Sequence, residues 1–347
     1  MEQGRFTYHE IMTQTEAWNE ALDRVEAQRS DLLDLFRPDY EQIIFTGCGS
    51  TYYLSLAASA LFQQCTGRIA RAVPAGELLL NEGTVLRHSP EHSLLIAISR
   101  SGATTETLRA VEQFKTRTRG NVLAITNYPE HALPKLADLA LVVEKGQEES
   151  VAQTRSFASM YVAAVATSLL VGARHADLHA MRRLAEVGAR LLHDYAPLAQ
   201  KMGANLNFDR FYFLGSGIRY GLACEANLKM KEMTLTHSEP FHFLEFRHGP
   251  MSMVNNRTVI VGLLSEANLP YEWAVLEEMR SLGATILSLS EADERASVQF
   301  QSGIPEIARG VLYLPVLQLM AYYRSLAKGL NPDRPTHLSA VVELGAL

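Results

Sequence analysis

The chain repeats one sequence pattern at a fixed offset. The segment 211–217 (FYFLGSG) matches the segment 43–49 (IIFTGCG), so that Gly215 corresponds to Gly47, and Tyr220 corresponds to Tyr52 at the same offset. Each copy is a short apolar run that ends in a glycine-containing turn, which is typical of a buried strand leading into a helix. Two copies of one α/β unit are therefore the simplest organisation for this sequence.

Apolar runs of strand length alternate with helical patterns in both copies. Near-continuous apolar strands separated by helices indicate a parallel sheet covered on both faces. We expect strands at 42–45, 94–98, 121–125, 139–143, 211–214, 258–264 and 285–289, and helices within 1–40, 52–63 and 176–201. The expected division is an N-terminal helical segment (1–40), a first domain (41–175), a helical linker (176–203), a second domain (204–330) and a tail (331–347).

Composition narrows the class of protein. The 347 residues carry a net charge of −6, which argues against a nucleic-acid coat or a polybasic membrane binder. Three widely spaced cysteines (Cys48, Cys65 and Cys224) fit neither a disulfide scaffold nor a zinc site, and favour a reducing cytoplasm. The N-terminus lacks a signal-peptide core, and the apolar stretch 161–171 is too short to span a bilayer. We expect a soluble cytoplasmic protein without metal or cofactor.

Hydroxyl-rich turns follow two strands of the first copy, at 47–51 (GCGST) and 99–104 (SRSGAT). Glycine lets the backbone approach a ligand, and helix N-termini with hydroxyl donors favour an anion such as phosphate. Neither turn is a P-loop, because no Lys-Ser/Thr follows the glycines, and Tyr52 stands where the dinucleotide fingerprint needs its third glycine. The alternative is that these serines and threonines only cap helices.

A charged triplet lies on one predicted helix of the second copy. Glu225, Lys229 and Glu232 are spaced i, i+4 and i+7, so they share a face. They form either a solvated salt-bridged face or a carboxylate that a lysine prepares for proton transfer. Three histidines follow (His237, His242 and His248), but their spacings of five and six do not place metal ligands on one helix face.

These residues together resemble the sugar isomerase (SIS) domain family. The resemblance rests on the two α/β copies, on Ile98-Ser99-Arg100-Ser101-Gly102 with Thr104, and on Glu225-x-x-x-Lys229-x-x-Glu232 followed by Phe246-Arg247-His248-Gly249-Pro250. It covers nearly the whole chain from about residue 8. The chain is similar to the double-domain phosphosugar enzymes, including the isomerase half of glucosamine-6-phosphate synthase. The resemblance implies two tandem flavodoxin-like domains, each a parallel five-stranded sheet flanked by helices, in a homodimer with sites at the subunit interface.

The resemblance also implies roles for individual residues. Glu232 would move a proton between C1 and C2 of a sugar phosphate, Lys229 would assist it, and His248 from the neighbouring subunit would open the ring. The phosphate would be bound by Gly49, Ser50, Thr51, Ser99, Arg100 (where relatives often have glutamine), Ser101 and Thr104, and the sugar would be contacted by Val151, Ala152 and Gln153.

Two departures from the synthase pattern shape the expected reaction. Nothing in the sequence before the repeats resembles a glutaminase domain, so we do not expect glutamine to be the nitrogen source. Ala340 stands where the synthase has the lysine that forms an imine with ketose phosphate, and alanine cannot do so. We therefore expect an aminosugar-phosphate deaminase of the glucosamine 6-phosphate type, which releases ketose phosphate and ammonia. The alternatives are a plain sugar-phosphate isomerase, a deglycase for 6-phosphorylated ketosamines, and a non-catalytic phosphosugar sensor.

Overall fold

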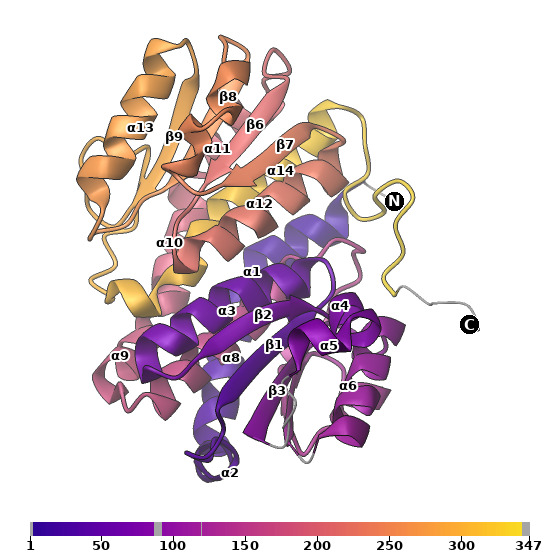
Figure 1. Ribbon diagram of the computed structural model, residues 1–347. Helices are drawn as coiled ribbons and strands as arrows, with labels where there is room; N and C mark the ends of the chain where they lie inside the picture. The colour runs from indigo at the N-terminus through magenta and orange to yellow at the C-terminus, as the bar shows by residue number, and fades with distance from the viewer. Residues whose placement is uncertain (1–2, 87–91, 119, 342–347) are drawn as a thin grey trace. The chain divides into compact units, whose positions relative to one another are not determined.

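The computed structural model describes residues 3–86, 92–118 and 120–341 (Figure 1). The chain forms two compact units. The first-repeat unit comprises Thr13–Glu148, Gln153–Arg182 and the tail from Ser339. The second-repeat unit comprises Arg183–Leu338, the short segment Glu149–Ala152 and the chain up to Met12.

The first-repeat unit contains a five-stranded parallel sheet in the order β2-β1-β3-β4-β5. Its strands are β1 (Gln42–Gly47), β2 (Ala70–Pro74), β3 (Ser93–Ile98), β4 (Val122–Thr126) and β5 (Leu139–Val142). Its helices are α2 (Arg29–Leu35), α3 (Ser50–Thr66), α4 (Ala75–Leu80), α5 (Glu82–Val85), α6 (Thr105–Arg117), α7 (Ala132–Leu136), α8 (Arg155–Val171) and α9 (His175–Ala180). Helix α1 (Arg5–Ala27) begins in the second-repeat unit and ends in this one.

The second-repeat unit contains a matching parallel sheet in the order β10-β9-β8-β6-β7. Its strands are β6 (Arg210–Leu214), β7 (His237–Phe241), β8 (Thr258–Leu263), β9 (Thr285–Ser290) and β10 (Val298–Gln299). Its helices are α10 (Leu184–Asp194), α11 (Ala196–Ala204), α12 (Ile218–Thr234), α13 (Leu269–Ser281) and α14 (Leu314–Ala327). The expected fold class, with two tandem five-stranded parallel sheets flanked by helices, is confirmed.

The two sheets share their strand register as well as their strand order. In the first sheet Gln42 is opposite Ser93, and in the second Arg210, which corresponds to Gln42 in the sequence repeat, is opposite Thr258. The turns after β1 and β6 also match, because Gly49 (φ 55°, ψ −123°) and Gly217 (φ 58°, ψ −129°) have nearly the same backbone conformation. This positive φ favours glycine. The sequence repeat is therefore a repeat of backbone geometry.

Three strands escaped the sequence analysis, and all three are short or lie at a sheet edge. β2 and β7 are edge strands, so most of their residues are only partly buried, and they include charged side chains such as Arg71 and Glu239. Pro240 lies within β7, a position that only an edge strand tolerates. The third, β10, is only two residues long.

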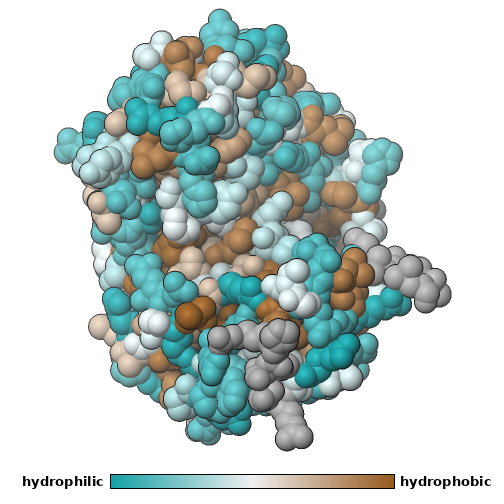
Figure 2. All heavy atoms as spheres, in the orientation of Figure 1, coloured by the Kyte–Doolittle hydropathy of each residue, from teal (hydrophilic) through white to brown (hydrophobic). Residues whose placement is uncertain are grey.

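The apolar stretch 161–171 lies in α8, in which every side chain from Ser156 to Leu170 is buried. An all-round apolar helix belongs inside a core, and α8 packs against α3 in the first-repeat unit. In the described part of the chain, no helix is both long and apolar enough to cross a membrane. The face of the molecule in Figure 2 is mainly hydrophilic, with apolar residues in smaller groups.

The turn after β1 generates a stability prediction. A Cβ atom at Gly47 would lie 2.8 Å from the Thr51 carbonyl carbon and 2.9 Å from the Ile98 oxygen, and these backbone atoms cannot move aside cheaply. We expect Gly47→Ala to lower the free energy of unfolding by about 2–3 kcal/mol, as overpacking does. Gly76→Ala is the control, because a Cβ there meets no atom within 4 Å and α4 gains a better helix former. Urea denaturation in which both variants behave alike would contradict the prediction.

Candidate active site

Two hydroxyl-bearing turns lie at the carboxyl edge of the first sheet. β1 and β3 are neighbours in that sheet, so the turns that follow them, 47–51 and 99–104, emerge side by side. Helix α3 begins at Ser50, within the first turn, and helix α6 begins at Thr105, directly after the second. The carboxyl ends of parallel strands, beside helix N-termini, are where α/β proteins bind anions and other ligands.

The helix-capping alternative does not account for these hydroxyls. The N-cap residues of α3 and α6 are Gly49 and Thr104, and neither makes a side-chain capping hydrogen bond. The Ser99 Oγ accepts the Gly102 N–H at 3.1 Å, and the Ser101 Oγ accepts the Ala103 N–H at 3.2 Å. A hydroxyl that accepts still has its proton to donate. Ser99 and Ser101 are thus held in place by the loop with a donor to offer.

The first turn binds itself more tightly. The Thr51 Oγ1 accepts the Cys48 N–H at 2.9 Å and donates to the Cys48 carbonyl oxygen at 3.0 Å. Ser50 and Thr51 are both buried. Thr51 therefore shapes the turn, and its hydroxyl proton is already engaged.

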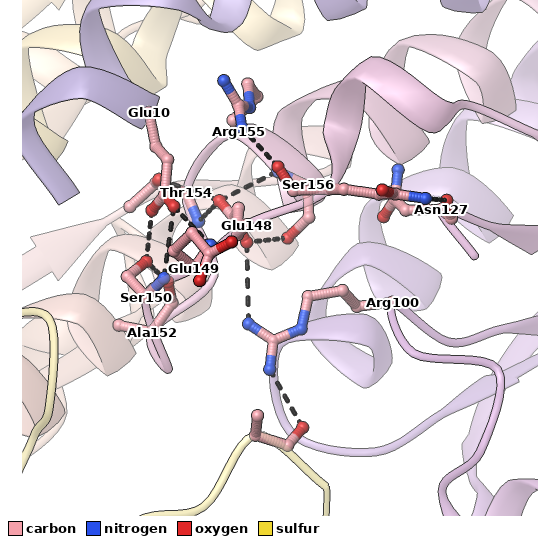
Figure 3. A network of polar contacts seen from close by, with 12 residues as sticks. Glu10, Arg100, Asn127, Glu148, Glu149, Ser150, Ala152, Thr154, Arg155 and Ser156 are labelled. Carbon is pink, nitrogen blue, oxygen red and sulfur yellow. Dashed lines mark hydrogen bonds and ion pairs between the residues drawn. The ribbon is translucent and has the colours of Figure 1, made fainter. Parts of the chain in front are cut away.

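Arg100 is directed to two protein groups. Its Nη1 lies 3.6 Å from the Glu148 Oε2, and its Nη2 donates to the Ala340 carbonyl oxygen at 2.9 Å (Figure 3). Both charged side chains are buried, with 6 % of Arg100 and none of Glu148 exposed. The guanidinium thus links the serine loop to the tail at the position where the resemblance places a lysine.

The carboxylate of Glu148 organises the start of α8. One of its oxygens accepts the Thr154 N–H at 2.7 Å and the Thr154 hydroxyl at 2.9 Å, and it also accepts the Ser156 N–H at 3.1 Å. Its other oxygen accepts the Ser156 hydroxyl (Figure 3). An acidic group at a helix N-terminus accepts hydrogen bonds from the free N–H groups, and its negative charge interacts favourably with the positive end of the helix dipole. Arg100 therefore positions the Glu148 carboxylate, which in turn positions Thr154, the residue after Gln153.

The three expected sugar-contact residues belong to different units: Val151 and Ala152 to the second-repeat unit, and Gln153 to the first-repeat unit. In the second-repeat unit, Glu10 accepts the N–H groups of Glu149 at 2.6 Å and Ser150 at 3.1 Å (Figure 3), and the Val151 N–H donates to the Asp333 carbonyl oxygen at 3.0 Å. In the same unit the Ala152 side chain is buried.

Gln153 belongs to the first-repeat unit. Its side-chain oxygen is buried and has no hydrogen-bond partner within the described ranges. A buried acceptor without a partner lowers the stability of the fold. This oxygen is therefore suited to accept a hydrogen bond from a ligand hydroxyl.

The charged triplet of the second repeat is a buried cluster on α12. The Lys229 Nζ lies 3.1 Å from the Glu225 Oε1 and donates to the Glu232 Oε1. Only 2 % of Lys229 and of Glu225 is exposed, against 14 % of Glu232. The solvated salt-bridge interpretation is therefore wrong for Lys229 and Glu225, and Glu232 is the member of the triplet that solvent reaches most.

The charge state of Lys229 follows from its partners. Burial by itself would lower the pKa of the Lys229 ammonium, but the carboxylates of Glu225 and Glu232 outweigh burial and raise this pKa above its usual value. Lys229 is therefore a fixed cation that donates a hydrogen bond to Glu232.

The histidines of the second repeat differ in their surroundings. His248 is exposed, and its backbone N–H donates to the Glu245 carbonyl oxygen at 3.0 Å, which closes a turn. Gly249 follows with φ 124°, a conformation that favours glycine. His242 stacks on Tyr220, with ring centroids 4.0 Å apart, and His237 begins β7.

Comparison with known proteins identifies the family to which the chain belongs. The SIS domain family model matches residues 38–170 and 207–323, which cover both repeats. The chain belongs to the SIS domain family. It is 28 % identical over 313 residues to glutamine–fructose-6-phosphate aminotransferase (isomerizing) of Methanothermobacter thermautotrophicus, covering 88 % of this chain and 52 % of that protein. It is also 28 % identical to the Pyrococcus horikoshii enzyme of the same name, covering 97 % of this chain and 57 % of that enzyme. The chain thus spans about half the length of these relatives.

Two solved structures extend this SIS comparison. Tagatose-6-phosphate ketose/aldose isomerase from Escherichia coli superposes with a TM-score of 0.87 at 25 % identity, covering 95 % of each chain. Glucosamine-6-phosphate deaminase from Thermotoga maritima superposes with a TM-score of 0.75 at 27 % identity, covering 94 % of this chain and 100 % of that one. These relatives are enzymes, and the chain is a phosphosugar isomerase-type protein of the SIS family.

Three carboxylates with structural roles in the site were not singled out as site residues from the sequence. Glu10 and Glu148 bind backbone N–H groups of one continuous segment, and Glu225 holds Lys229. Only Glu225 had a signal, its i, i+4 spacing from Lys229. Glu10 lies 140 positions from its partner Ser150 in the chain, so no local pattern reveals the contact.

The buried triplet predicts a large effect of removing its cation. Lys229→Met leaves Glu225 buried beside an apolar chain, and we expect the free energy of unfolding at pH 7 to fall by about 3–5 kcal/mol. Adding Glu225→Gln to Lys229→Met should recover much of the loss, because the unpaired charge is then gone. Lys231→Met is the matched control, since Lys231 is exposed on the same helix. Equal denaturation midpoints for the Lys229 and Lys231 variants would disprove the role assigned to this cluster.

Proposed function

We propose that this SIS protein is a phosphosugar isomerase-deaminase that converts an aminosugar phosphate of the glucosamine 6-phosphate type into ketose phosphate and ammonia. The observation that carries the proposal is the buried, positively charged Lys229, which forms an ion pair with Glu225 and a hydrogen bond to the more exposed Glu232. A carboxylate beside a fixed cation is suited to move a proton between adjacent carbons, because the cation stabilises the charge that develops.

The phosphate would be bound by the hydroxyl-bearing turns of the first-repeat unit. Ser99 and Ser101 keep hydroxyl protons to donate, and the N-terminus of α6 supplies N–H groups after Thr104. Arg100 would act as a positioning residue, since its guanidinium is directed to Glu148 and Ala340. In this proposal Gly49, Ser50 and Thr51 complete the cradle, while Val151, Ala152 and Gln153 border the sugar.

The reaction needs proton transfer and water. His248 would open the pyranose ring by moving a proton between the C1 hydroxyl and the ring oxygen. Glu232 would take the proton from C2 of the open aldehyde and return it to C1, while a proton passes from the amino group to O1, which leaves a C1 hydroxyl and an imine at C2. Water then adds to this imine, and the C–N bond breaks to give the C2 ketone and ammonia. No lysine nucleophile is required, which agrees with Ala340 in the tail.

The comparisons support the deaminase assignment, since the Thermotoga maritima structure bears that name and is 27 % identical. We further propose a homodimer, with His248 acting on the partner's substrate, as the resemblance implies.

The cysteines Cys48, Cys65 and Cys224 are all free thiols, which supports a cytoplasmic location.

A plain aldose–ketose isomerase is the second candidate. The Escherichia coli tagatose-6-phosphate ketose/aldose isomerase has the higher TM-score of the two enzymes compared, 0.87 against 0.75. Isomerisation uses the same ring opening and the same proton shuttle, and it differs only in having a hydroxyl at C2.

Turnover distinguishes these candidates. We expect the purified protein to release ammonia and fructose 6-phosphate in equal amounts from glucosamine 6-phosphate, and Glu232→Gln to lower kcat by about 10²–10⁴-fold while phosphosugar still binds. Tagatose 6-phosphate turnover without ammonia from any aminosugar phosphate would establish the isomerase instead. Binding without turnover of glucosamine 6-phosphate, tagatose 6-phosphate and fructosyl-lysine phosphate would identify a sensor.

The phosphate cradle has its own kinetic signature. Ser101→Ala removes one hydrogen bond to a charged phosphate, and we expect KM to rise about 10–100-fold with a smaller change in kcat. Ser59→Ala is the control, because the Ser59 hydroxyl bonds within α3 to the Leu56 carbonyl oxygen, away from the turns. If KM were unchanged in Ser101→Ala, the phosphate would have to bind elsewhere.

A further inference from the structure

The second-repeat unit has a cavity at the place that corresponds to the serine loop of the first. It measures about 310 Å³ and is lined by Ser216, Phe243, Leu244, Asn268, Tyr271 and Glu272. Ser216 follows β6, Phe243 and Leu244 follow β7, and the other three follow β8 at the start of α13. β6 and β8 are the adjacent strands at which the connections of this sheet change direction. That point is where open α/β sheets bind ligands.

The anion position of this second cradle is filled by the protein itself. The Glu272 Oε2 accepts the Ser265 N–H at 2.6 Å, and its Oε1 accepts the Ser265 hydroxyl at 3.0 Å. These are the kinds of donor that a phosphate would use at such a turn. Glu272 is 2 % exposed, so its carboxylate is an internal substitute for a bound anion. A phosphate could enter only by displacing this buried carboxylate.

The charges around the cavity favour a cation. The Arg219 Nη2 lies 3.9 Å from Glu272, and Arg219 pairs more closely with Glu306. The other buried guanidinium nearby, Arg309, is shared between Glu266 at 2.7 Å and Glu291 at 3.4 Å. Two cations thus serve four carboxylates, and none of the six lining side chains is cationic.

Burial also leaves Glu272 short of solvent. Desolvation raises the pKa of its carboxyl, although Ser265 and Arg219 work in the opposite direction. Ser265 gives one hydrogen bond to each of the two Glu272 carboxylate oxygens, and each oxygen can accept a further one. An ammonium group in the cavity would supply the missing donor.

The walls of the cavity are apolar and open to solvent at its mouth. Leu244 is 51 % and Tyr271 66 % exposed, whereas Phe243 is buried. The segment of Phe243 and Leu244 is the apolar stretch that precedes His248, and neither residue has a part in the proton transfer proposed above. An aromatic and an aliphatic side chain held at the mouth of a cavity with one polar floor are typical of a small-molecule site.

We propose that this cavity binds a small organic amine, protonated at neutral pH, with an apolar ring or chain against Phe243, Leu244 and Tyr271 and its ammonium directed to Glu272. This binding site goes beyond the proposed reaction and does not depend on it.

Three probes of one shape test the proposal on the full chain: benzylamine, benzyl alcohol and benzoate. Calorimetry or ligand-observed NMR should show benzylamine binding about 10–100-fold more tightly than the alcohol, because its hydrogen bond to Glu272 is charge-assisted. Benzoate should not bind. Saturating glucosamine 6-phosphate should leave benzylamine binding unchanged, whatever reaction the protein catalyses.

Variants locate the site. Tyr271→Ala and Leu244→Ala change exposed side chains, so the fold should persist, and each should weaken benzylamine binding at least about fivefold by removing apolar contact. Glu272→Gln should remove the preference for the amine over the alcohol. Leu282→Ala is the control, an exposed leucine directly after the far end of α13.

Absence of benzylamine binding to the wild-type protein would overturn the proposal. So would equal binding of benzoate, equal affinity in Tyr271→Ala and the wild type, or displacement of benzylamine by glucosamine 6-phosphate, which would assign the amine to the substrate site.

Discussion

The turn between strand and helix is the constraint on which both halves of this molecule depend. At Gly47 and at Gly215 the helix that follows lies so close to the strand end that a Cβ atom would meet backbone at 2.8 Å and 2.5 Å, respectively. Two positions later, Gly49 and Gly217 have φ values of 55° and 58° and nearly equal ψ. This geometry aims the free N–H groups of α3 and α12 at the carboxyl edge of each sheet. The ligand chemistry of each unit is then decided by the side chains set into that frame.

The two copies have diverged at those side chains, and the differences are electrostatic. Where the first copy has the small hydroxyl of Thr51, the second has the guanidinium of Arg219 at the corresponding position of the repeat. Arg219 bonds the carboxylate of Glu306 and approaches Glu272, and Glu272 takes the N–H and hydroxyl of Ser265. The first copy keeps neutral hydroxyl donors at Ser99 and Ser101, while the second has satisfied its donors at Ser265 internally. One backbone therefore holds two different electrostatic environments.

Much of this fold can be predicted from the sequence, because the pattern that encodes it is local and occurs twice. The apolar runs before Gly47 and Gly215 fix the central strands, and the repeat offset fixes their shared register. Edge strands such as β7, with Pro240 and charged residues, lack that pattern because they are half solvated. The site divides in the same way. The serine loop and the triplet on α12 have local spacings that identify them. Arg100, by contrast, pairs with a carboxylate that follows β5, two strands further along the chain, and its second contact is in the tail.

The buried carboxylates link stability to function in this chain. The Glu148 side chain is inaccessible to solvent, and its charge is compensated by Arg100 and by N–H and hydroxyl donors at the start of α8. The charge of Glu225 is compensated by the ammonium of Lys229. Lys229 must divide its charge between Glu225 and Glu232, so any change at Glu232 alters the electrostatics of the whole buried cluster. A carboxylate that gains and loses a proton during turnover is most useful when a neighbouring cation holds its position in both states. The buried Glu225 contributes to this by keeping Lys229 charged, and Glu232 is the member of the cluster with the greatest exposure to solvent.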